Sequence, residues 1–236
     1  MKVERIHGAQ LALLHLCDSA FPIGAFAYSD GLEAAVSSGQ IATPGDLRAW
    51  LEVCRDESIG RTEGPAVWQA WRAFHDADWA SLLVLDDELT ALRPAASIRR
   101  SSRAMGLRLL TTWQALHPEP RLEQALVLAA PGGRDGGFGP ALPIAFAGAC
   151  ATSGIARHMA VEAFAYTRLA ATVSAAMRLM PLGQTEAHGM LAATLDRVPE
   201  VVEAIASRDA RIESFAPAMD IAAMTQQYVH SRLFRS

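Results

Sequence analysis

The chain has 236 residues, 51% of them hydrophobic, and a formal net charge of −4. A chain of this length can bury a full hydrophobic core, so it needs no disulfides for stability. Arginine supplies nearly all of the positive charge, because Lys2 is the only lysine, and the basic stripe typical of nucleic-acid-binding proteins is absent.

Helix-forming residues dominate and alternating strand patterns are absent, so an all-α fold is predicted. The clearest helix start is Thr43, which can cap a helix whose first residue is Pro44 and whose first turn contains Asp46. In chain order, helices are expected at about 9–17, 29–37, 43–54, 63–75, 79–92, 94–117, 143–152, 156–179, 182–195, 199–207 and 216–227.

We expect these segments to form a single-domain bundle of about ten helices that spans residues 1–236. Residues 131–140 contain five glycines and are predicted to form a surface loop, with a domain boundary as the alternative. The helix at 156–179 is rich in alanine, which lets neighbouring helices approach closely. We therefore place it at the centre of the bundle.

Motifs for catalysis, nucleotide binding and metal binding are missing. No two of the seven histidines are three or four residues apart, the spacing at which one helix presents a metal site. The Gly-rich stretch lacks the Gly-Lys-Ser/Thr of a phosphate-binding loop. The acidic residues within 76–88 are expected to be solvated. We predict no catalytic, cofactor-binding or metal-binding residues, and we expect the chain to bind other proteins and not to be an enzyme.

The cysteines and the N-terminus favour a location in the cytoplasm. Cys17, Cys54 and Cys150 form no CxxC pair, which is typical of reduced thiols in a cytoplasmic protein. The N-terminus does not read as a signal peptide. No segment approaches the roughly 20 apolar residues of a membrane helix.

An alternative function is suggested by the tryptophans. A helical enzyme or ligand-binding protein could have a pocket lined by Trp50, Trp68, Trp71 and Trp113. Tryptophans spaced along amphipathic helices more often belong to a core. A self-assembling structural protein without other partners is a third possibility.

The arginines of the long helix at 94–117 also allow two interpretations. Arg99, Arg100, Arg103 and Arg108 include spacings of three and four residues, which gather charge on one side. This side is either a solvated face paired with the acidic segment 76–88, which we favour, or a docking face for an acidic partner.

Two stretches near the chain ends contain residues that core packing alone does not explain. In Phe21–Glu33, Phe26 and Tyr28 offer apolar rings, and Gly31 is expected inside a helix, where a close contact with another backbone would explain it. The tail 228–236 carries aromatic residues and arginines, the types enriched at interface hot spots. An apolar tail with arginines is expected to dock on a partner.

These stretches resemble the urease accessory protein family UreF. Phe21–Glu33 is similar to the family's N-terminal signature, residues 181–185 to its second marker, and residues 232–236 to its C-terminal end. Met105-Gly106 matches a family pair in the central helix. The acidic residues that the family places before this pair are replaced here by Pro94, Ser97 and Ser101.

The resemblance implies an all-helical, dimeric protein that binds UreD (also called UreH) and then the GTPase UreG. The assembly delivers nickel to apo-urease in the cytoplasm, and this chain would bridge its partners and couple GTP hydrolysis to nickel transfer. We expect the tail to order against UreD. Together, the residues and the resemblance predict these partner-binding positions: Phe26, Tyr28, Ser29, Gly31, Glu33, Arg103, Gln184, Tyr228, Arg232, Leu233, Phe234 and Arg235.

Overall fold

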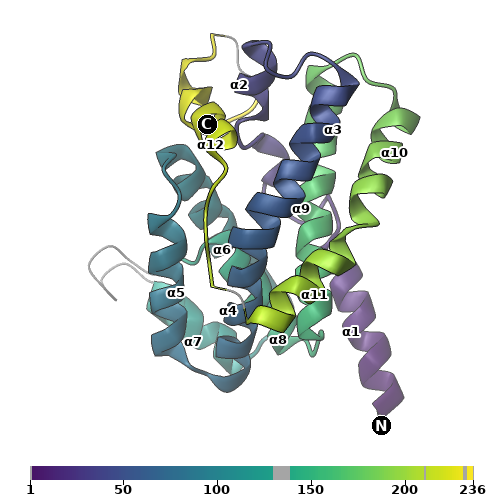
Figure 1. Ribbon diagram of the computed structural model, residues 1–236. Coiled ribbons are helices and arrows are strands. Elements are labelled where there is room, and N and C mark those ends of the chain that lie inside the picture. Colours follow the sequence, from purple (N-terminus) through teal and green to yellow (C-terminus); the bar gives the residue numbers. More distant parts are fainter. Residues whose placement is uncertain (1, 130–138, 210, 231–232, 236) are drawn as a thin grey trace.

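The computed structural model describes the chain except residues 1, 130–138, 210, 231–232 and 236. The described residues form a helical bundle without strands, apart from one isolated parallel bridge between Tyr28 and Arg235 (Figure 1). The predicted all-α fold is confirmed. Among the residues that the structure describes, none of the helices combines the length and the hydrophobicity that a transmembrane helix requires.

In chain order, the α-helices of the described residues are α1 (Lys2–Leu16), α2 (Leu32–Ser37), α3 (Pro44–Val53), α4 (Gly64–Asp76), α5 (Trp79–Ala91), α6 (Ala96–Leu116), α7 (Pro120–Ala129), α8 (Leu142–Thr152), α9 (Arg157–Leu179), α10 (Gln184–Leu195), α11 (Val198–Arg208) and α12 (Pro217–Thr225). Two 3-10 helices, η1 (Ala25–Ala27) and η3 (Gln226–Tyr228), and the π-helix η2 (Cys54–Glu63) complete the fold.

The predicted start of the third helix is confirmed. The Thr43 hydroxyl accepts a hydrogen bond from the Asp46 backbone, and the Asp46 carboxylate accepts one from the Thr43 backbone. This reciprocal pairing satisfies two backbone donors that the first turn of a helix otherwise leaves unpaired. The helix does not end at Cys54 as expected, because it continues through the π-helix into α4.

Other boundaries differ from the prediction for local reasons. Helix α2 begins at Leu32 and not near Ser29, because Asp30 and Gly31 both have a left-handed backbone (φ 50° and 94°). Helix α7 was not predicted. It begins directly at Pro120, a residue that suits the first helical position.

The core forms around two helices, α8, in which ten of eleven residues are buried, and α9, which its alanines placed at the centre. Helix α9 packs against α4, α8, α10 and α11, and Figure 1 shows it behind α3 in the middle of the bundle. Ala160, Ala165 and Ala176 are fully buried on it. Helix α1 leads away from this bundle toward the N-terminus.

The Gly-rich stretch 131–140 lies outside the described residues except for Gly139 and Pro140. The chain that follows it is anchored by Asp86, whose carboxylate accepts a hydrogen bond of 2.8 Å from the Ala141 backbone. The expectation that Asp86 is solvated was wrong, since this side chain is fully buried. Burial raises the pKa of the carboxyl group, and the Ala141 amide and Arg103, 4.0 Å away, oppose that shift.

Gly106 allows α6 to touch the chain that leads into α8. A Cβ atom at this position would lie 1.9 Å from the Pro140 carbonyl oxygen. We predict that Gly106→Ala lowers the free energy of unfolding by about 1–3 kcal/mol or more, because the clash is with backbone. Thermal unfolding checks this, with an expected fall in Tm of about 2–4 °C for each kcal/mol.

Gly189 in α10 offers a matched control for Gly106. It has nothing within 4 Å of an added Cβ atom, so Gly189→Ala should leave Tm unchanged or raise it slightly. Equal effects of the two substitutions would contradict the proposed close approach.

Candidate functional site: the docked C-terminal tail

The two stretches singled out near the chain ends lie against each other. The Arg235 backbone N–H donates a 2.7 Å hydrogen bond to the Ala27 carbonyl, which pairs the tail with the segment before Tyr28. About 200 residues of sequence separate the two segments joined by this bridge, so packing of the whole bundle brings them together. The tail is therefore part of the fold at its described residues 233–235.

The Glu33 side chain binds the backbone of the tail. Its side chain is buried (4% exposed) at the start of α2. One carboxylate oxygen accepts a 2.5 Å hydrogen bond from the Leu233 backbone, and the other accepts one of 3.3 Å from the Phe234 backbone. Two successive amides of the tail thus bind one carboxylate, and hydrogen bonds to a charged acceptor are about twice as strong as neutral ones.

Gln226 holds the Glu33 carboxylate in place. Its side-chain amide donates a 2.6 Å hydrogen bond to Glu33 and accepts one of 3.1 Å from the Ala34 backbone. Gln226 is itself buried at the end of α12. Both polar atoms of this buried amide are satisfied, which a stable buried network requires.

Phe234 anchors the tail through its side chain. The ring is buried (4% exposed) and belongs to the hydrophobic core. The Arg178 guanidinium of α9 lies 4.2 Å above the ring centroid and also donates a hydrogen bond to the Phe26 carbonyl. Arg178 therefore links the tail and the Phe26 segment by a cation–π contact and a backbone contact.

Gly31 sets the distance between α2 and α12. A Cβ atom on it would lie 2.7 Å from the Ala223 backbone nitrogen, and its φ of 94° favours glycine as well. The predicted close contact with another backbone is present. The predicted position inside a helix is wrong, because Gly31 is the residue that precedes α2.

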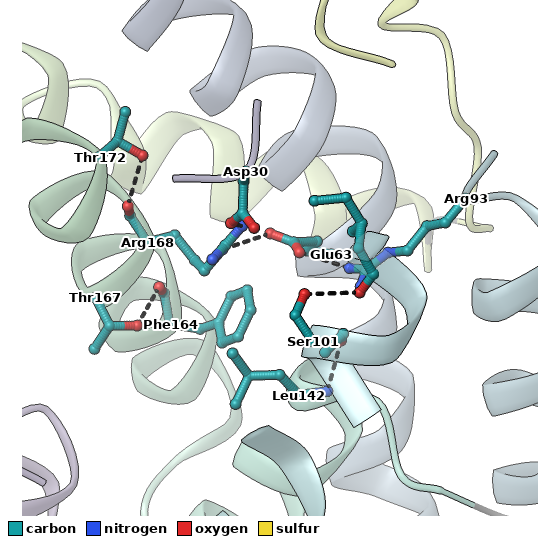
Figure 2. A network of polar contacts seen from close by, with 11 residues as sticks. Asp30, Glu63, Arg93, Ser101, Leu142, Phe164, Thr167, Arg168 and Thr172 are labelled. Carbon is teal, nitrogen blue, oxygen red and sulfur yellow. Dashed lines mark hydrogen bonds and ion pairs between the residues drawn. The ribbon is translucent and has the colours of Figure 1, made fainter. Parts of the chain in front are cut away.

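A partly buried ion network fixes the turn before α2. Figure 2 shows the Arg168 guanidinium of α9 between Asp30, at 2.5 Å, and Glu63, at 3.1 Å. Arg93 binds the other oxygen of Glu63 at 2.6 Å. Burial opposes the charge on Arg168, but the two carboxylates outweigh this effect and raise the pKa of its guanidinium. The network joins the turn at Asp30 to the end of the π-helix.

The remaining predicted positions are distributed over several places. Exposed side chains around the docked tail are Phe26, Leu233, Arg235 and Tyr228, of which Phe26 and Tyr228 are 74% and 78% exposed. Ser29 is buried and Tyr28 is half-buried. Arg232 lies outside the described residues.

Two predicted residues lie away from the tail contacts. Gln184 is exposed at the start of α10. Arg103 lies on α6, where it approaches Asp86 and hydrogen-bonds Thr90. The contact of Arg103 with Asp86 is one pairing between the long arginine helix and the acidic segment 76–88, whereas Arg99 and Arg108 donate hydrogen bonds to backbone carbonyls.

Helix α12 adds an apolar surface beside the tail. Ile221 and Met224 of α12 and Tyr228 of η3 are exposed, whereas Ala222 and Ala223 of α12 are buried. A helix that buries one face and exposes large apolar side chains on another has a surface suited to a partner.

The tryptophans do not converge on one pocket. Trp113 is fully buried in the core, while Trp68 and Trp71 donate hydrogen bonds to Asp209 and to the Ile155 carbonyl. Trp50 borders a cavity of about 20 Å³ next to Arg168. Within the described ranges, no group of three or more His, Cys, Asp or Glu side chains is arranged to hold a metal ion.

Comparison with known proteins assigns the chain to a family. The family model described as UreF matches residues 41–195. The chain is 32% identical to urease accessory protein UreF of Teredinibacter turnerae, with 96% of this chain and 98% of the relative covered. It is 33% identical to the proteins of the same name from Azoarcus sp. and Methylibium petroleiphilum, with 96% of this chain and 95% and 93% of the relatives covered. The chain belongs to the UreF family.

Proposed function

We propose that this protein is a urease maturation chaperone without catalytic chemistry of its own. It bridges UreD and the GTPase UreG in the cytoplasm and couples GTP hydrolysis to nickel insertion into apo-urease. The observation that carries the proposal is the likeness to urease accessory proteins over 96% of the chain. The exposed apolar side chains around the docked tail support a role in protein contacts.

The tail and α12 form the UreD-binding surface in this proposal. Phe26, Leu233, Met224 and Tyr228 are exposed there, and aromatic and methionine side chains are enriched at protein interfaces. Because Glu33 and Gln226 hold the tail, its exposed side chains are presented in a defined position. A preorganised surface binds with less loss of conformational entropy than a free tail.

Removal of residues 228–236 is expected to abolish co-purification with UreD while far-UV circular dichroism stays unchanged. The reason is that the exposed tail residues leave, whereas the helices keep their contacts with one another and lose only the Phe234 ring from the core. Val127→Ser on α7 serves as a control, since Val127 is also an exposed apolar residue (59% exposed) on a helix distant from the tail. Unchanged binding by the truncated chain would refute a role of the tail in UreD binding.

A gene deletion tests the maturation role itself. The deletion strain should accumulate urease that lacks nickel, measured by metal analysis of the purified enzyme, and the intact gene should restore it. Nickel-loaded, active urease in the deletion strain would contradict the proposal. We also propose that the chain forms a homodimer, which light scattering of the isolated chain tests.

A further inference from the structure

Two histidines far apart in sequence meet on the surface beside the buried Trp113. The imidazole centroids of His15 and His117 are 6.4 Å apart. Both rings contact the indole of Trp113, at centroid distances of 5.8 Å and 4.4 Å. Phe21 packs edge-on against His15 at 5.3 Å. These aromatic contacts hold the two exposed rings on the same side of the molecule.

The ring nitrogens of both histidines are available. Both side chains are exposed, and in the part of the chain that the structure describes, no hydrogen bond uses a ring nitrogen of His15 or His117. A histidine that serves only the core normally satisfies its nitrogens with protein partners. Here both imidazole rings pack against Trp113, and their nitrogens form no hydrogen bond with the described protein residues.

The helix ends at this place favour a cation. His15 lies in the last turn of α1, and His117 is the residue that caps the C-terminus of α6. The C-terminal end of a helix carries partial negative charge from its unpaired carbonyl groups. Each imidazole therefore lies at the negative end of its own helix, and the two imidazoles are close to each other.

We propose that His15 and His117 form an open binding site for a divalent transition-metal ion that favours imidazole ligands, such as Zn²⁺. Imidazole nitrogen suits zinc, copper and nickel, whereas magnesium prefers oxygen. Two protein ligands leave the other coordination positions to water. The bound ion would join the end of α1 to the end of α6. The site is independent of the proposed function, since it concerns metal binding by the isolated chain.

The separation of the two ring centroids is close to that of a bound pair. Metal–nitrogen bonds of about 2.0–2.1 Å place two imidazole centroids on one ion at roughly 5 Å from each other. The rings of His15 and His117 would have to approach by about 1 to 1.5 Å. Rotation of exposed side chains takes place within nanoseconds and allows such an adjustment.

Calorimetric titration of the full chain with Zn²⁺ tests the site. His15→Gln and His117→Gln should each weaken Zn²⁺ binding at least tenfold, because each removes one of two ligands, and Mg²⁺ should not bind the wild-type chain there. His188→Gln is the matched control, since His188 is exposed on α10. Wild-type affinity in both ligand variants would overturn the proposal.

A second measurement uses the wild-type chain, so it does not depend on the folding of any variant. Diethyl pyrocarbonate modifies free imidazole nitrogens, and mass spectrometry identifies the modified histidines. Zn²⁺ should protect His15 and His117 together while His188 stays reactive. Equal modification of His15 and His117 with and without Zn²⁺ would show that no ion is bound there.

Discussion

Replacement of Arg168 by methionine is expected to lower the free energy of unfolding by about 3 kcal/mol. Removing one partner of a buried ion pair leaves an uncompensated charge, which costs about 3–5 kcal/mol. The lower end applies here, because the side chains of Arg168 and Asp30 are only partly buried, at 23% and 25% exposed. Glu63 also keeps its contact with Arg93. Denaturant unfolding of the variant and of the wild-type chain measures the difference.

Arg197→Met is the matched control for this experiment. Arg197 pairs with Glu200 at 2.7 Å on the surface, with a side chain that is 62% exposed. Exposed pairs contribute about 0–1 kcal/mol, so the control should change stability little. The combination of Arg168→Met with Asp30→Asn should destabilise less than the sum of the two single changes. Strict additivity would mean that the two side chains do not interact.

Replacement of Glu33 by alanine is expected to release the tail while the bundle stays folded. The carboxylate accepts hydrogen bonds from the Leu233 and Phe234 amides, and a hydrogen bond to a charged group contributes about 1.5–3 kcal/mol. Hydrogen exchange of these two amides should therefore accelerate about tenfold to a hundredfold. Mass spectrometry of a C-terminal peptide measures this change, and co-purification with UreD should fall in parallel.

Glu186→Ala provides the control for Glu33→Ala, since Glu186 is an exposed glutamate in the first turn of α10. It should affect neither the exchange of the tail amides nor the binding of UreD. Glu33→Gln keeps one acceptor oxygen but lacks the charge, so an intermediate exchange rate is expected. If the tail amides exchange equally fast in the wild-type chain and in Glu33→Ala, Glu33 does not hold the tail.

The sequence allowed the prediction of most helices. Apolar periodicity and the Thr43 cap are local signals, and the structure has the helices they indicate. Helix α7 was not assigned, although its apolar residues directly precede the Gly-rich stretch, and Pro118 and Pro120 separate it from α6. The left-handed backbone of Asp30 was missed because only Gly31 carries a signal for it.

The sequence indicated that both ends of the chain contain residues suited to a partner surface. It did not indicate that the two ends contact each other. Phe21–Glu33 and the tail 228–236 were each expected at a partner surface, since side-chain chemistry alone does not reveal an intramolecular contact across about 200 residues. Gln226 and Arg168 carry no distinctive signal. A glutamine at a helix end and an arginine among alanines become informative only when their partners Glu33, Asp30 and Glu63 are placed around them.

The contact between Glu33 and the tail sets different requirements for the residues at positions 233 and 234. Glu33 binds main-chain N–H groups, and every residue except proline supplies such a group. The side chain of Leu233 therefore plays no part in its own attachment and remains exposed. Any residue other than proline at position 233 can therefore supply this hydrogen bond. Position 234 has a stricter requirement, because its buried ring also belongs to the core.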